Sequence, residues 1–128
     1  MDPVSRRQAR RQALVLLFQW DVTGEPLGTL YGSEADPYAR EVAEAVIEHA
    51  EELDTAITAA AEGWTADRLG TIERNVLRIA LHELGSGQVP DEVAIDEAVT
   101  LAKRYATPEA GRLVNGILGR IVRERRLV

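Results

Sequence analysis

The stretch TIERNVLRIALHELG, residues 71–85, carries the pattern that decides the fold. Its apolar residues recur at spacings of three and four, which predicts a helix from about Thr71 to Gly85. The apolar face of this helix comprises Ile72, Val76, Leu77, Ala80, Leu81 and Leu84. A face this wide must be covered from several sides, so we expect the helix to lie at the centre of the fold.

Four other segments repeat the helical period. We expect helices from about Ser5 to Asp21, from Pro37 to Glu62 with a break near its centre, from Asp91 to Tyr105, and from Pro108 toward the C-terminus. Asp36 precedes Pro37 in the order of a cap and a first helical residue. Residues 22–37 are rich in glycine and proline and predict a loop. No stretch alternates as a strand would, so the predicted class is all-α in a single domain, 1–128.

Three glycines interrupt the last predicted helix: Gly111, Gly116 and Gly119. Each costs about 1 kcal/mol relative to alanine inside a helix. We interpret them as places where another backbone, or RNA, approaches closely.

Composition excludes several classes of protein. The chain is 45% hydrophobic and 28% charged, which is typical of a globular domain, and it lacks the cysteine that disulfides and thiolate chemistry need. No apolar run has the length of a membrane span, and we expect a cytoplasmic protein. The two histidines, His49 on a predicted apolar stripe and His82 on a polar face, have no partners at metal-ligand spacing. We therefore predict neither an enzyme nor a bound cofactor.

Charge is divided unevenly along a chain whose net charge is -6. Residues 1–20 hold four arginines and one acid, residues 101–128 hold seven basic residues and two acids, and the middle holds eighteen acids and four arginines. If the ends meet, they form one positive surface, which is what a polyanion recognises. Accidental segregation, or basic ends that bind the acidic middle, is the alternative.

The strongest local signal is four arginines within six residues: Arg6, Arg7, Arg10 and Arg11. On a helical wheel they flank or oppose the apolar stripe, accompanied by Phe18. Arginine beside an aromatic ring suits single-stranded nucleic acid, whereas burial of Phe18 by another helix is the alternative. Glu73 lies within the apolar arc of the central helix, either as a first-turn acid favoured by the helix dipole or as an acceptor for a partner.

Four ordered blocks resemble the NusB family of bacterial transcription antitermination factors. They are Arg6-Arg7-Gln8-Ala9-Arg10 with Leu17, Phe18 and Asp21; Ile72-Glu73-Arg74-Asn75-Val76-Leu77-Arg78; Val93-Ala94-Ile95-Asp96-Glu97-Ala98; and Val114-Asn115-Gly116-Ile117-Leu118. The resemblance implies two packed helical subdomains. It also implies binding of single-stranded boxA RNA with NusE, a ribosomal protein, in the RNA polymerase complex that reads through terminators, chiefly in ribosomal RNA operons.

By position, the resemblance implies roles for particular residues. Arg6, Arg7 and Arg10 would hold RNA, and Arg78, Glu109, Arg112 and Leu113 would line the same surface. Phe18, Asp67 and Glu73 would face NusE. Three residues depart from the family pattern: Asp96 where Asn is usual, Leu113 where Phe is usual, and Gly119 where an acid is common. Loss of a stacking ring at position 113 predicts weaker intrinsic RNA binding or a greater dependence on NusE.

Alternatives to this function remain. A helical protein adaptor, perhaps a homodimer that buries its arginine face, is the one we leave open. The accessory domain of ribosomal RNA cytosine methyltransferases is not expected, because these residues include no methyl-donor domain and no cysteine. Binding of duplex DNA lacks the short recognition pair of a helix-turn-helix motif.

Overall fold

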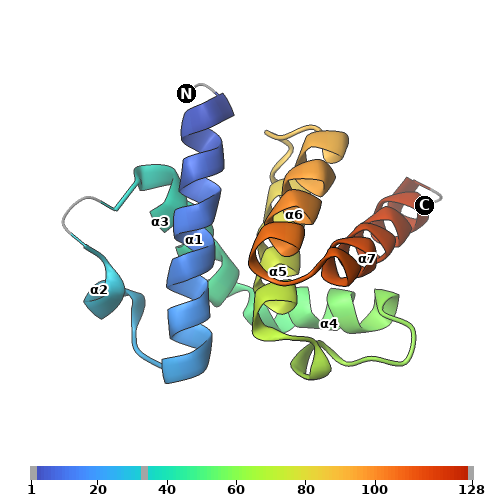
Figure 1. The fold of residues 1–128 in the computed structure, drawn as a ribbon, viewed down its shortest axis with the longest axis horizontal. Helices are drawn as coiled ribbons and strands as arrows, with labels where there is room; N and C mark the ends of the chain where they lie inside the picture. The colour runs from blue at the N-terminus through green and yellow to red at the C-terminus, as the bar shows by residue number, and fades with distance from the viewer. Residues whose placement is uncertain (1–2, 33–34, 127–128) are drawn as a thin grey trace.

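The computed structural model describes residues 3–32 and 35–126, and every regular element in that part of the chain is helical (Figure 1). The predicted all-α class is therefore confirmed. The elements are α1 (Pro3–Thr23), α2 (Leu27–Leu30), α3 (Pro37–Glu48), α4 (Ala50–Ala60), the 3-10 helix η1 (Ala66–Arg68), α5 (Thr71–Ser86), α6 (Asp91–Tyr105) and α7 (Pro108–Arg126).

Helix α5 is central, as its wide apolar face predicts. It packs against α1 and α3 on one side and against α4, α6 and α7 on the other (Figure 1). Val76, Leu77 and Ile79 on α5 are at most 2% exposed. The two groups of helices that share α5 are the two packed helical subdomains expected from the resemblance.

Two local predictions need correction. The expected loop over residues 22–37 contains the short helix α2, which was not predicted, whereas the break expected near the centre of residues 37–62 is confirmed at His49, between α3 and α4. His49 was predicted on an apolar stripe, but it is exposed at this break, with its Nδ1 3.7 Å from Glu52 Oε1. A break changes the rotational register of the helix, so the wheel drawn over the whole segment misplaces His49.

Of the three α7 glycines, only Gly111 lies close to another helix, and approach of RNA at these positions stays a prediction. A Cβ at Gly111 would lie 2.6 Å from Lys103 Cγ, which is a side chain of α6. A Cβ at Gly116 would meet no atom within 4 Å, and one at Gly119 would meet only Arg123 of the same helix. Gly111 therefore serves helix packing, whereas the surface at Gly116 is open.

Candidate nucleic-acid interface

A groove of about 410 Å³ between α1 and α6 collects three arginines. Arg7 and Arg11 reach it from successive turns of α1, and Arg104 reaches it from the last turn of α6. The Arg7 side chain is 65% exposed, and its Nε donates to Glu97 Oε1 at 2.8 Å. Because the lining holds three guanidinium groups and one carboxylate, the groove is positive and suits phosphate oxygens. Its remaining lining is Thr100 and Leu101.

Arg6, the residue before Arg7 on α1, does not line this groove and is partly buried. Its guanidinium carbon is 4.3 Å from the centre of the Tyr38 ring on α3, a distance at which a cation is attracted to the ring face. Its Nε is buried and has no hydrogen-bond partner among the described residues. Arg6 is thus held against α3, and only part of its side chain is available to a ligand.

Arg10 does not belong to the exposed surface, which corrects the prediction that it holds RNA. It is 3% exposed, and its Nε donates to both carboxylate oxygens of Glu83 on α5, at 2.9 and 3.0 Å. The Tyr38 hydroxyl donates to the same carboxylate at 2.5 Å. Burial, together with this hydrogen bond to Glu83, raises the pKa of Tyr38. Arg10 therefore joins α1 to α5 and α3 inside the protein.

Arg78 needs the same correction. It is 5% exposed, and its guanidinium donates to both carboxylate oxygens of Asp54 on α4, at 2.8 and 2.7 Å. Its Nη1 donates to Asp21 on α1 at 3.1 Å. Burial alone would lower the pKa of Arg78, but the hydrogen bonds and charges of Asp54 and Asp21 outweigh it, so the pKa is raised. Arg78 locks three helices together rather than lining the surface.

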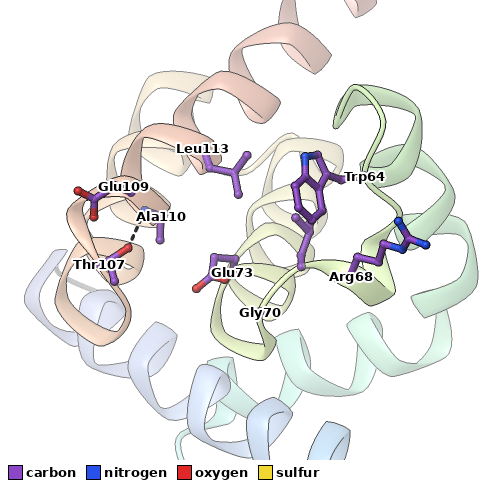
Figure 2. Close-up of a pocket in the computed structure, with 9 residues that line it drawn as sticks. Trp64, Arg68, Gly70, Glu73, Thr107, Glu109, Ala110 and Leu113 are labelled. Carbon is purple, nitrogen blue, oxygen red and sulfur yellow. Dashed lines mark hydrogen bonds between the residues drawn. The ribbon is translucent and has the colours of Figure 1, made fainter.

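A second hollow, of about 460 Å³, lies between the start of α5 and the start of α7 (Figure 2). Trp64 and Leu113 extend toward it from opposite sides, and Glu73 lies below Leu113 in this view. The predicted residues Glu73, Glu109 and Leu113 come together here. The Glu73 carboxylate folds back over Gly70, where an added Cβ would lie 2.1 Å from its Oε2. The rest of the lining is Arg68, Leu69, Thr107 and Ala110.

Arg112 does not line this hollow. It borders a neighbouring one of about 430 Å³, which shares Trp64 and Leu113 with the first. Asp67 lies exposed in η1 and lines neither of these two hollows. A hydrogen bond with the Thr65 side chain is the main cause that lowers the pKa of Asp67.

Phe18 is 39% exposed, so its burial by another helix is excluded. Val15 and Val22 are 55% and 61% exposed, and their spacing of three and four from Phe18 places all three on one face of α1. One turn after Phe18, Asp21 Oδ2 accepts from Arg74 Nε at 2.9 Å, so this end of α1 lies beside the start of α5, where Glu73 sits.

Sequence reasoning missed three features of this surface. Val15 and Val22 were findable, because apolar residues on the face opposite a buried stripe are a recognisable signal. Arg104 carries no local sign that it meets Arg7 and Arg11, because α6 lies far from α1 in the sequence. Trp64 likewise has no local signal, since only the fold brings its ring opposite Leu113.

Two other findings concern the described residues alone. Within 3–32 and 35–126, no helix is both long enough and apolar enough to cross a membrane. In the same residues, no group of three or more histidine, aspartate or glutamate side chains is placed to hold a metal ion.

Comparison with known proteins gives a consistent result. A model of the NusB family matches residues 7–123. The transcription antitermination protein NusB of Solibacter usitatus is 38% identical over 131 residues, which cover 94% of this chain and 90% of that protein. The structure of T. maritima NusB is 37% identical, with a TM-score of 0.83, covering 93% of this chain and 91% of that one. A crystal structure of the antitermination factors NusB and NusE with double-stranded RNA holds a chain 31% identical to this one, with a TM-score of 0.84, covering 96% and 99% of the two chains.

Proposed function

Because this chain belongs to the NusB family, we propose that it is a transcription antitermination factor that binds single-stranded boxA RNA together with NusE. The observation that carries the proposal is the convergence of Arg7, Arg11 and Arg104 in the groove between α1 and α6. Guanidinium groups bind phosphate oxygens through paired N–H donors, and several along one groove follow a nucleic-acid strand.

In this role the protein acts in the cytoplasm as part of the RNA polymerase antitermination complex. It promotes read-through of terminators, chiefly in ribosomal RNA operons, by binding alone and without catalysis. The RNA surface continues from Arg104 past the end of α6 to Glu109 and Leu113, because α7 begins at Pro108, only a few residues after Arg104. Arg6 contributes the exposed part of its side chain, and Arg112 adds a cation on the next turn of α7.

Arg10 and Arg78 support this surface from beneath. Arg10 holds α1 against α5 through Glu83, and Arg78 joins α5 to α4 and α1. Fixed helix positions keep Arg7 and Arg11 facing α6, which lowers the entropy lost when phosphates bind.

NusE, in this proposal, covers the apolar stripe Val15, Phe18 and Val22 on α1. An exposed row of three apolar residues on one helix face is typical of a protein-binding surface. Glu73 and Asp67 lie near the C-terminal end of the stripe, at the start of α5 and in η1, and offer carboxylate acceptors to the basic side chains of a ribosomal protein. A second copy of this chain is the alternative occupant of the stripe.

The RNA surface is tested with fluorescence anisotropy of a labelled boxA RNA and a scrambled RNA of equal length. Arg11→Glu should weaken boxA binding more than tenfold and reduce the slope of log K against log salt by about 0.7, the share of one phosphate on a single strand. Arg40→Glu is the matched control, since Arg40 is an exposed arginine on α3 outside the groove. Equal effects of the two variants would remove the groove from the RNA surface.

Sedimentation velocity with and without NusE separates the two occupants of the apolar stripe. A monomer that forms a one-to-one complex with NusE supports the proposal. A dimer that Phe18→Ser converts to monomer would assign the stripe to a second copy instead.

A further inference from the structure

The two hollows beside α7 adjoin each other, and we call them together the trough. The hollow of about 460 Å³ and the hollow of about 430 Å³ share Trp64 and Leu113 as their common wall. Trp64 is 54% exposed and Leu113 is 37% exposed, so both present apolar surface to solvent at this junction. The trough therefore combines a large aromatic ring with room on each side of it.

Trp64 is held in place by the turn that ends α4. Glu62 and Gly63 have φ values of 37° and 89°, in the left-handed region that non-glycine residues rarely adopt. The Trp64 N–H donates to the Ala61 carbonyl at 3.3 Å, and the Ala66 N–H donates to Thr58 Oγ1 at 3.0 Å. This turn directs the ring to the junction of the hollows instead of toward the core.

Helix α7 lines the second hollow with a row of cations. Arg112, Arg120 and Arg123 lie within one narrow arc of the helix and span about 16 Å along its axis. Arg120 is paired with Glu62 at 3.2 Å and Glu124 at 2.8 Å. Arg112 and Arg123 make no ion pair within the described part of the chain. Among the described residues, Glu62 is the one acid in the lining of this hollow. The lining therefore carries a net positive charge.

The first hollow has the opposite character. Its lining contains Glu73 and Glu109 against the single cation Arg68. Glu73 is assigned to NusE above, so Glu109 is the carboxylate that can accept a hydrogen bond from the exocyclic amino group of a base, whereas arginines bind phosphates. An aromatic ring between an acceptor-rich hollow and a cationic row matches a nucleotide, with the base on one side and the backbone on the other.

We infer that Trp64 is a stacking platform for a base and that the α7 row holds the adjoining phosphates, so that the RNA surface proposed above extends past Leu113 to a further subsite at Trp64, Arg120 and Arg123. The inference rests on the proposed function, because it takes RNA as the ligand. Charge favours RNA over a protein as the ligand, since Arg112 and Arg123 make no ion pair with the described residues and can bind phosphates. Continuity also favours it: Arg104 lines the α1–α6 groove, and Thr107 and Glu109, shortly after it, line the trough.

Trp64 is the aromatic residue in the lining of the trough, and it lies opposite the aliphatic Leu113. The side chain of Leu113 is aliphatic, and an aliphatic side chain stacks weakly on a base. Trp64 faces Leu113 across the hollow (Figure 2). A base placed against the Trp64 ring would contact Leu113 on its other side, so the ring provides stacking that Leu113 does not.

The test compares three labelled RNAs: a short boxA core and the same core extended by a single-stranded pyrimidine tract at its 5′ or its 3′ end. One extended RNA should bind more tightly than the core. Trp64→Ala should abolish that gain, a loss of about 5- to 150-fold for one stacked base, while binding of the core stays within twofold. Trp64→Phe should retain most of the gain, and Trp64→Leu, which restores apolar volume without a stacking ring, should not.

Arg123→Glu is the second variant, and it should lose the same gain and lower the salt slope for the extended RNA only. Arg40→Glu on α3 is its matched control. Trp64 lies exposed, so circular dichroism should confirm that each variant folds. Quenching of Trp64 fluorescence by the extended RNA, absent in Trp64→Phe, reports stacking directly.

Distinct results would overturn the inference. Equal binding of all three RNAs by the unaltered protein, or an undiminished gain in Trp64→Ala, would exclude the subsite. Quenching of Trp64 by NusE alone, or by self-association on raising the protein concentration, would assign the trough to a protein. Failure of the proposed function is recognised separately, since Arg11→Glu would then leave binding of the short core unchanged.

Discussion

Replacement of Arg10 by methionine tests whether this arginine is structural. Methionine keeps most of the aliphatic volume but removes the charge, so Glu83, which is 1% exposed, loses the partner that donates at 2.9 and 3.0 Å. Removal of one member of a buried ion pair typically costs about 3–5 kcal/mol. For a chain of 128 residues, that corresponds to a fall in Tm of about 10–20 °C.

Thermal and urea unfolding, followed by circular dichroism, measure this loss. The double variant Arg10→Met/Glu83→Gln should recover much of it, because neither charge then remains buried without a partner. Arg7→Met is the control: its side chain is 65% exposed, and loss of an exposed pair should cost less than about 1 kcal/mol.

RNA binding at a temperature where all variants are folded completes the test. Arg10→Met should bind boxA RNA nearly as well as the unaltered protein, whereas Arg7→Met should bind it more weakly. An Arg10→Met protein with unchanged Tm and lost RNA affinity would refute the structural role and return Arg10 to the RNA surface.

Three further predictions follow from single residues. Burial and the hydrogen bond to Glu83 raise the pKa of the Tyr38 hydroxyl above its ordinary value of 10.0. The contribution of Tyr38 to the free energy of unfolding is therefore complete below pH 10 and is lost as pH rises toward the pKa in the folded state. In urea titrations above pH 10, the free energy of unfolding of Tyr38→Phe should fall less with pH than that of the unaltered protein. Gly116→Ala should raise the unfolding free energy by about 1 kcal/mol, since its Cβ would meet no atom within 4 Å, and an unchanged Tm would contradict this. Val22→Glu should abolish NusE binding in calorimetry while changing stability by less than about 0.5 kcal/mol, because Val22 is 61% exposed; retained affinity would remove it from the partner surface.

Much of the fold could be predicted because its signals are local. The helix expected over 91–105 has those bounds, and Asp36 caps α3 by accepting from the Tyr38 and Ala39 N–H groups. The wide apolar face of residues 71–85 correctly indicated the central helix, because burial on several sides leaves a direct mark on residue type. The short helix α2 was missed, since four residues hold too little periodicity to be recognised.

The candidate site was less predictable because its key contacts join distant segments. Arg10 shares a helical face with Ala13 and Leu17, which hints at burial, but only Glu83 makes that burial tolerable for a charge. Glu83 lies 73 residues away, and no local sequence pattern in either segment indicates that the two side chains meet. The same holds for Arg78, which the resemblance implied on the RNA surface and which Asp54 and Asp21 neutralise inside the fold.

The positions of the four arginines on the α1 helix determine which of them face a ligand and which are held inside the fold. Arg7 and Arg11 are four residues apart and therefore share the face toward α6, where their charges remain available. Arg10 turns inward and binds Glu83, and Arg6 lies against Tyr38, so both anchor the helix that carries the other two. The four arginines look like one basic patch in the sequence, but in the fold Arg7 and Arg11 face the groove while Arg6 and Arg10 anchor α1 to its neighbours. Charge reversal at Arg11 should change affinity without stability, whereas neutralisation of Arg10 should change stability without affinity. If all four arginines belonged to one exposed basic patch, the variants at Arg10 and Arg11 would both change RNA affinity and leave stability unchanged.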